Sequence, residues 1–325
     1  MYKIKQVPED FIVKEISNFA VEETGRYLYY KLKKKNRNTL NVVRELSRQL
    51  KIAEKQIGFA GSKDKHACTE QLISILGVSK DKIETVNIDN ISLEFLGYGP
   101  EPVTLGDLQG NNFEITVRDL DQVNVKETDF VENYFDEQRF SSHNSEIGRS
   151  LVKKDFKKAA KLIEDLRLKE HLSKYQNDFI GALKKLPLRL LKMYVHAYQS
   201  YLWNETVSAL LQGKEVEYSL GKFVFAEERS YMEIPIIGFS TELDESKEVI
   251  SRIMRKESLN FSDFVIKQIP EISMEGDLRK VCVDVSDFSY IEGNDELNDG
   301  KKKVLLKFFL PKGSYATMVV RKVFG

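Results

Sequence analysis

Cysteine and histidine are scarce in this chain, whose 325 residues include two cysteines and four histidines. Cys68 and Cys282 lie far apart in the sequence, so we expect free thiols in a reducing cytosol and no disulfide framework. His66 and Cys68 are close, but no second pair at metal-ligand spacing accompanies them, and the Cys-x-x-Cys pair of a zinc deaminase is missing. We therefore predict no metal site.

Long hydrophobic runs and an excess of charge of one sign are also lacking. The most apolar long stretch, 186–211, contains Arg189, Lys192 and Glu205, which excludes a membrane span. The N-terminus has no apolar segment of the signal-peptide kind, so we expect a soluble, cytoplasmic protein. Basic and acidic residues number 50 each. This balance excludes a histone-like nucleic-acid binder but not an enzyme with a locally basic groove.

A glycine-rich cofactor loop after a predicted strand is missing as well. Residues 58–63 lack the four-residue spacer of a phosphate-binding Walker loop, and no dinucleotide fingerprint is convincing. We therefore predict no cofactor. A methyltransferase, which would need such a loop, is disfavoured.

The spacing of apolar residues indicates an α+β protein. Alternating or extended apolar segments predict strands over 4–16, 27–32, 72–76, 112–117 and 304–310. Helical spacing, with capping signals, predicts helices over 38–50, 146–168, 186–211 and 242–256. The helical middle is therefore predicted to be inserted between two halves of a sheet-containing domain.

The segment 58–71, GFAGSKDKHACTEQ, places an acid between two lysines on a polar turn. Its two glycines allow the backbone to pass close to a neighbour. In an extended backbone Lys63 and Lys65 point away from the face that Asp64 uses, yet both raise the local positive potential and attract phosphate. Composition alone favours a solvated loop in which Asp64 caps a turn, because short motifs often match by chance.

The same segment resembles the signature around the catalytic aspartate of the TruD family of tRNA pseudouridine synthases. Further blocks resemble those of the family and follow in the family order: PEDFIVKE (8–15), LQGNNFEITVR (108–118), NYFDEQRF (133–140), AYQSYLWNE (197–205) and PKGSYATMVVRKV (311–323). Asp136 departs from the glycine that the family often has there, and Tyr315 departs from the phenylalanine of some members. Asp136 puts the local backbone in question, since glycine tolerates conformations that aspartate adopts less readily.

The resemblance implies an isomerase that converts a uridine of tRNA, by default uridine 13, to pseudouridine without a cofactor or an obligate protein partner. It implies that Asp64 is the catalytic carboxylate. Attack on ribose C1′, attack on the base and removal of a sugar proton are all open roles for it. Substrate contacts implied in the same way are Phe11, Asn133, Phe135 and Tyr315, because a flipped base stacks on aromatic rings and an amide can pair with uracil. Core packing is the alternative for each aromatic.

Basic stretches are the candidates for contacts with the RNA backbone. The run 26–37, RYLYYKLKKKNR, interleaves aromatic and basic residues, and phosphate contacts there would release counterions. A solvated strand or helix face is the alternative interpretation. The candidate residues are Lys33, Lys34, Lys35, Arg37, Lys63 and Lys65. The aromatic stretch 194–203 has helical spacing, so we predict that it forms core and not a base-stacking surface.

The resemblance also implies the domain organisation. We expect a discontinuous catalytic domain, residues 1–150 and 280–325, with a pseudouridine-synthase core and a mixed β-sheet. Residues 151–279 would form the inserted, helix-rich α/β TRUD domain. The alternative function is a tRNA-binding or RNA-folding chaperone with the same fold and lost or secondary catalysis, which would not need the Asp64 block.

Overall fold

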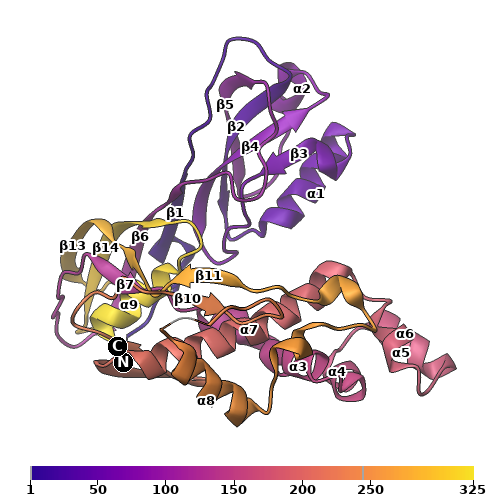
Figure 1. Cartoon of the computed structure of the whole chain (residues 1–325). Helices are drawn as coiled ribbons and strands as arrows, with labels where there is room; N and C mark the ends of the chain where they lie inside the picture. Colours follow the sequence, from indigo (N-terminus) through magenta and orange to yellow (C-terminus); the bar gives the residue numbers. More distant parts are fainter. Residues whose placement is uncertain (1, 244) are drawn as a thin grey trace. The chain divides into compact units, whose positions relative to one another are not determined.

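The computed structural model describes residues 2–243 and 245–325. It divides the chain into two compact units (Figure 1). The first unit is formed by Met1–Phe130, Asp284–Ala316 and Phe324, and the second by Val131–Val283, Thr317–Val323 and Gly325. The predicted boundaries of a catalytic and an inserted domain stay a prediction.

A mixed β-sheet forms the first unit. Its strands are β1 (Phe11–Ile16), β2 (Tyr27–Lys35), β3 (Ile57–Phe59), β4 (Cys68–Leu76), β5 (Ile91–Gly99), β6 (Gly110–Leu120), β13 (Ser286–Asn294) and β14 (Lys302–Pro311). In the described part of the chain these eight strands follow the order β13-β14-β6-β1-β4-β2-β5, with β3 paired to β4. The β1–β4 pair is parallel, whereas β2–β4 and β1–β6 are antiparallel. The α+β class with a mixed sheet is therefore confirmed.

Helix α1 (Thr39–Leu50) covers one face of this sheet. Asn38 caps it by accepting a hydrogen bond from the backbone N–H of Leu40 at 2.9 Å. Leu46 of α1 packs with Leu32 of β2 and Ile73 of β4 in one buried cluster. We call this side of the sheet the helix face. The short helices of the unit are η1 (Pro8–Asp10), η2 (Glu54–Gln56) and α2 (Lys80–Glu84).

The opposite side of the sheet, which we call the open face, carries alternate residues of β2. Side chains alternate along a strand, so Lys33 and Lys35 lie on the open face while Leu32 and Lys34 lie on the helix face. The register places Cys68 opposite Lys35 and Glu70 opposite Lys33. This alternation decides which lysines of the basic run can approach Asp64.

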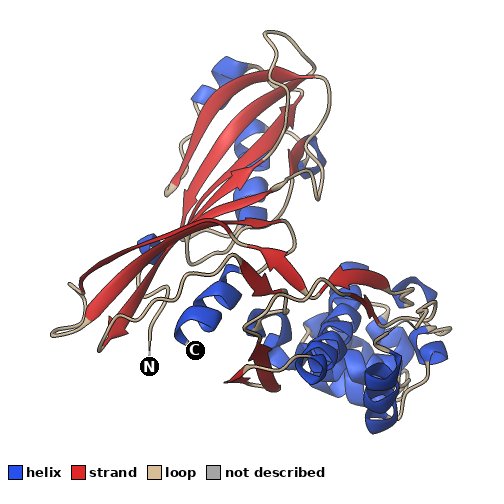
Figure 2. Cartoon of the chain, turned by 60° about the vertical axis from the view of Figure 1, so that its left-hand side comes forward, coloured by secondary structure: helices blue, strands red, loops and turns tan. Residues whose placement is uncertain are grey.

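Helices dominate the second unit, as Figure 2 shows in blue. They are η3 (Glu137–His143), α3 (Asn144–Val152), α4 (Phe156–Leu162), α5 (Leu166–Lys174), α6 (Phe179–Leu183), α7 (Leu188–Leu210), α8 (Lys247–Glu257), η4 (Phe261–Phe264) and η5 (Pro270–Ile272). Tyr198, Leu202 and Trp203 of α7 are at most 1% exposed. The prediction that residues 194–203 form core is confirmed.

Short antiparallel pairs complete the second unit. They are β8 (Lys214–Tyr218) with β9 (Gly221–Phe225), and β10 (Glu233–Ile236) with β11 (Asp277–Lys280). The chain passes between the units within the paired strands β7 (Phe130–Glu132) and β12 (Cys282–Asp284), and again in α9 (Ala316–Phe324). In the described residues no helix is long and apolar enough to cross a membrane.

The predicted helical region 146–168 consists of three helices. Asp155 and Asp165 interrupt it, because each carboxylate caps a new helix by accepting hydrogen bonds from backbone N–H groups two or three residues on. The predicted helix 242–256 corresponds to α8, which begins later, at Lys247; residue 244 lies outside the described part. Asp136 has φ −76° and ψ 162°, an extended conformation that aspartate adopts freely, so the doubt about its backbone is removed.

Candidate active site

The loop between β3 and β4, residues 60–67, carries Asp64 and is held by buried side chains. Thr39 at the start of α1 accepts a hydrogen bond from the backbone N–H of Lys63 at 3.1 Å and donates to Gln71 at 3.2 Å. Gln71, in β4, donates to the carbonyl oxygen of Gly61 at 3.0 Å. Thr39 and Gln71 are both buried. Satisfied buried networks of this kind fix a single backbone path.

Lys34 adds a buried cation beside this loop. Its ammonium donates to the carbonyl oxygens of Arg37 at 2.7 Å and Asp64 at 2.8 Å, with Lys63 O at 3.4 Å. The residue is 3% exposed. Burial lowers the pKa of Lys34 to about 8, although the negative charge of Asp64 acts in the opposite direction. Lys34 therefore holds the backbone carbonyl of Asp64 in place by a hydrogen bond.

Replacing Lys34 with methionine is expected to change how stability depends on pH. Between pH 8 and 10.5 the unfolded chain binds more protons at Lys34 than the folded chain, so the wild type gains stability as pH rises through this window. The difference in unfolding free energy between wild type and Lys34→Met should grow by up to about 3 kcal/mol in favour of the wild type. Urea unfolding at pH 7.5 and 10.5 measures it.

Lys33→Met is the matched control, since Lys33 lies on the open face with its side chain 44% exposed. The growth measured for Lys34→Met is assigned to its burial only where it exceeds any change that Lys33→Met shows over the same pH range. A constant difference for Lys34→Met would contradict the assignment of Lys34 as a buried cation.

Lys63 forms a buried ion pair with Glu15 of β1. The two side chains are 7% and 0% exposed. The other carboxylate oxygen of Glu15 accepts a hydrogen bond from the backbone N–H of Leu72 at 3.2 Å. Because breaking such a pair leaves a buried charge uncompensated, at a cost of about 3–5 kcal/mol, it ties the loop firmly to the sheet.

The carboxylate of Asp64 forms an ion pair with a lysine that also contacts an aromatic ring. Its Oδ2 lies 2.9 Å from the Nζ of Lys5, and the side chains are 29% and 22% exposed. The same ammonium lies 4.0 Å from the centroid of the Phe11 ring, a cation–π contact. Phe11 is 3% exposed and packs edge-on against Phe113. Lys5 thus brings Asp64 and Phe11 together in the first unit.

Asn133 and Phe135 are brought together in the second unit by Arg279. The guanidinium donates to the side-chain oxygen of Asn133 at 2.6 Å and to its carbonyl oxygen at 2.8 Å. It also lies 4.2 Å from the Phe135 ring centroid. Asn204 of α7 fixes the main chain of Phe135 with hydrogen bonds at 3.0 and 2.9 Å. The amide and the ring are therefore held rigidly relative to each other.

Tyr315 lies in the short connection between β14 and α9, with its side chain partly exposed. The structure therefore places the predicted substrate residues in the first unit (Phe11, Tyr315) and in the second (Asn133, Phe135). Their roles in binding uridine stay predictions.

The basic candidates fall into three environments. Lys34 and Lys63 are buried in the contacts described above, which leaves their ammonium groups little access to a phosphate. Lys33 pairs with Glu94 at 3.1 Å, Lys35 pairs with Glu9, and Arg37 pairs with Glu45. Lys65 is exposed. The Lys33 and Lys35 pairs are exposed and contribute little to stability, so an anion could replace the carboxylate partner, whereas the Arg37–Glu45 pair is half-buried. RNA contact stays a prediction.

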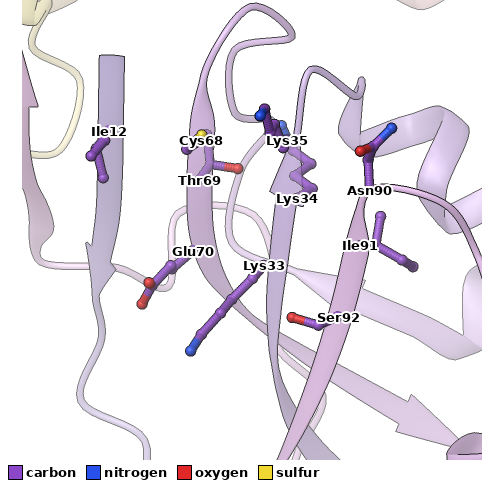
Figure 3. A pocket seen from close by; sticks show the side chains of 10 residues that line it. All are labelled: Ile12, Lys33, Lys34, Lys35, Cys68, Thr69, Glu70, Asn90, Ile91 and Ser92. Atoms are coloured by element: carbon purple, nitrogen blue, oxygen red, sulfur yellow. The ribbon is translucent and has the colours of Figure 1, made fainter. Parts of the chain in front are cut away.

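A hollow of about 390 Å³ on the open face is lined by residues of this basic run (Figure 3). Lys33 and Lys35 border it together with Cys68 and Glu70 of β4 and Ile12 of β1. Lys34 also lines the hollow, and its ammonium donates to the carbonyl oxygen of Asp64 at 2.8 Å. The hollow therefore shares Lys34 with the surroundings of the Asp64 main chain.

Sequence reasoning missed several residues that hold these groups. Glu15 and Gln71 lie inside the quoted blocks PEDFIVKE and GFAGSKDKHACTEQ. Their position in these blocks could have marked them as candidate site residues. Lys5 lies three positions before its block, and Arg279 lies outside every block. Lys5 pairs with Asp64, 59 positions away, and Arg279 with Asn133, 146 positions away, so only the folded chain reveals these pairs.

A metal centre finds no support among the described residues, where no group of three or more His, Cys, Asp and Glu side chains is placed to bind an ion. Cys68 and Cys282 are both free, as predicted.

Comparison with known proteins gives matches along nearly the whole chain. The family model described as tRNA pseudouridine synthase D (TruD) matches residues 2–166, 162–230 and 214–323. A protein of Methanosarcina acetivorans named probable tRNA pseudouridine synthase D is 32% identical, over 98% of this chain and 92% of its own. The tRNA pseudouridine synthase D of Aquifex aeolicus is 31% identical, over 99% and 98%.

A solved structure is similar to the fold as a whole. The crystal structure of the putative tRNA pseudouridine synthase D of Methanosarcina mazei superposes with a TM-score of 0.73 at 30% identity. The match covers 98% of this chain and 92% of that one.

Proposed function

Because the chain belongs to the tRNA pseudouridine synthase D (TruD) family, we propose that it isomerises uridine 13 of tRNA to pseudouridine with Asp64 as the catalytic carboxylate. The family makes it a tRNA-modifying isomerase. The position of the uridine and the role of the aspartate are the parts that this proposal adds.

The observation that carries the proposal is the contact of one ammonium with both Asp64 and Phe11. Lys5 Nζ lies 2.9 Å from the carboxylate and 4.0 Å from the ring centroid. A carboxylate aimed from a rigid loop beside an aromatic ring supplies an acid–base or nucleophilic group next to a surface on which a flipped base stacks. A solvated loop with Asp64 as a turn cap would not need Thr39, Gln71 and Lys34 to hold it.

The reaction replaces the carbon–nitrogen bond between ribose and uracil with a carbon–carbon bond, without net oxidation or reduction. The bond from ribose C1′ to uracil N1 breaks, a bond from C1′ to C5 forms, the C5 proton leaves and N1 gains a proton. Asp64 can serve by attacking C1′, by attacking the base or by removing a sugar proton. All three roles require the charged oxygen at a defined place, which the Lys5 and Lys34 contacts supply.

The base itself would be recognised by the residues that the family resemblance implies. Asn133 presents an amide, which can pair with the uracil edge through one donor and one acceptor. In this structure its oxygen accepts from Arg279 and its nitrogen donates to the carbonyl of Lys280 at 3.3 Å. Pairing with uracil would replace these contacts. Phe11, Phe135 and Tyr315 are the proposed stacking surfaces. Phe11 and Phe135 are only 3% and 8% exposed, and Lys5 and Arg279 lie over their rings, so stacking on either ring requires that cation to move aside.

Position mapping tests the proposed substrate. Unmodified tRNA transcripts with uridine or cytidine at position 13 would be incubated with the protein, derivatised at pseudouridine and read by primer extension. We expect a stop at position 13 in the first transcript and none in the second. A stop elsewhere in both transcripts would overturn the position and keep the reaction. Tight binding of tRNA without any stop would favour the RNA-chaperone alternative.

A further inference from the structure

A buried charge cluster lies in the first unit, built from three segments that are remote in sequence. Arg118, near the end of β6, is its centre. Its Nε donates to Asp10 at 2.8 Å, its Nη1 to Asp295 at 2.7 Å and its Nη2 to Glu296 at 3.0 Å. The side chains of Arg118, Asp10 and Asp295 are 6%, 1% and 0% exposed. Removing such charges from water is costly, so the cluster tolerates little distortion.

Asp295 is fully used as a hydrogen-bond acceptor. Its Oδ1 accepts from Arg118 and from the backbone N–H of Leu297, and its Oδ2 accepts from the backbone N–H of Asp119 and from Asn298. Burial alone would raise the pKa of Asp295, but these hydrogen bonds hold it well below its ordinary range. Asparagine at position 295 would place its side-chain NH₂ group, a donor, opposite N–H groups that are themselves donors.

The cluster anchors the N-terminal segment on both sides of Lys5. Before it, Lys3 exchanges two backbone hydrogen bonds with Arg118, at 2.9 and 2.8 Å. After it, Gln6 accepts from Asn298 at 3.1 Å, and the N–H of Val7 donates to Asp10 at 3.0 Å.

Lys5 itself is in the left-handed region, with φ 57°. Such a conformation is uncommon for a lysine and persists where the surroundings fix it. The long side chain has many rotamers, and ordering it costs entropy. The backbone anchors therefore decide whether its ammonium reaches Asp64, because they set the point from which the side chain starts.

We propose that the Asp10–Arg118–Asp295 cluster is a positioning device that sets the place of Lys5 and, through it, of the Asp64 carboxylate. Asp295 is then a positioning residue for catalysis, although it lies far from Asp64 in the sequence and touches neither Asp64 nor Lys5. The inference rests on the proposed function for its kinetic consequence, and on geometry alone for its effect on the Lys5–Asp64 pair.

The kinetic test is a double-mutant cycle between Asp295→Asn and Lys5→Met. Asp295→Asn is expected to lower kcat about tenfold in the wild-type background, with KM for tRNA nearly unchanged. In the Lys5→Met background it should have almost no further effect, because the group it positions is gone. Asp121→Asn is the matched control: it removes the same charge from an exposed carboxylate that pairs with Lys301, outside the cluster.

A second test measures stability and does not depend on enzymatic activity. Urea unfolding of wild type, Lys5→Met, Asp64→Asn and the double variant gives the coupling free energy of the pair. This coupling should be measurable in the wild-type background and vanish in the Asp295→Asn background. If Asp295→Asn does not fold, Asn298→Ala takes its place in both arms, since it loses the bonds to Gln6, Asp295 and Lys3 but no charge.

The outcomes separate the two proposals. The positioning role would be overturned if Asp295→Asn lowered kcat equally in the wild-type and Lys5→Met backgrounds. It would also be overturned if Asp295→Asn left the Lys5–Asp64 coupling free energy unchanged. A wild type that binds tRNA and forms no pseudouridine would overturn the proposed function, and the unfolding arm would still decide the role of the cluster.

Discussion

Replacing Asp64 with asparagine is expected to lower kcat at least about 10⁴-fold. The amide keeps the size of the side chain but loses the charge and the basic oxygen that every open mechanism needs. Formation of the C1′–C5 bond releases the C5 hydrogen, so release of tritium from tRNA labelled at uracil C5 measures the rate. The affinity for tRNA should change little, because one carboxylate contributes little to a large polyanion interface.

The control for this substitution is Asp89→Asn, a change of the same kind at another residue of the first unit. The carbonyl oxygen of Asp89 accepts a hydrogen bond from Arg37, and this backbone contact survives the substitution. Its rate should match that of the wild type. If Asp64→Asn kept more than about a tenth of the wild-type rate, Asp64 could not be the catalytic group.

Replacing Lys5 with methionine is expected to lower kcat about 10- to 150-fold. Hydrogen bonds to charged groups contribute about 1.5–3 kcal/mol, and each 1.4 kcal/mol corresponds to a factor of ten in rate. Methionine has a similar length but loses the cation–π contact with Phe11 and leaves Asp64 without its partner on Oδ2. Single-turnover kinetics with saturating enzyme measures the effect apart from tRNA binding and product release.

Lys5→Arg refines this result, since arginine keeps the charge but has a different reach and a planar head. We expect it to recover part of the lost rate. A Lys5→Met variant as active as the wild type would show that the carboxylate is aimed by its loop alone.

Local patterns predicted much of the fold. The amphipathic spacing of 38–50 and the alternation of 112–117 correspond to α1 and β6, because local spacing decides which face of an element is buried. Strand β2 continues to Lys35, beyond the predicted 27–32, because β4 pairs with it through this residue. No local signal reveals such pairing when the added residues are lysines.

The sequence motif around Asp64 was predictable, but the contacts that hold its loop in place were not. The quoted blocks predicted Asp64 and Phe11 as site residues, and the structure brings both to Lys5. Lys34 was predicted, like Lys33 and Lys35, as a contact of the RNA backbone. It is buried because strand alternation turns it toward carbonyl oxygens of a loop about 30 residues ahead, a contact that exists only in the folded chain. Arg118 lies inside the quoted block 108–118, but its contact with Asp295 spans 177 positions, so the pairing of the two residues could not be recognised from their neighbours.

We propose that this chain forms pseudouridine in tRNA with the carboxylate of Asp64. The most direct measurement is nucleoside analysis of one unmodified tRNA transcript after incubation with wild type or with Asp64→Asn, both confirmed to be folded and to bind the tRNA. We expect one pseudouridine per tRNA from the wild type and none from the variant. Equal pseudouridine from both proteins, or none from either, would contradict it.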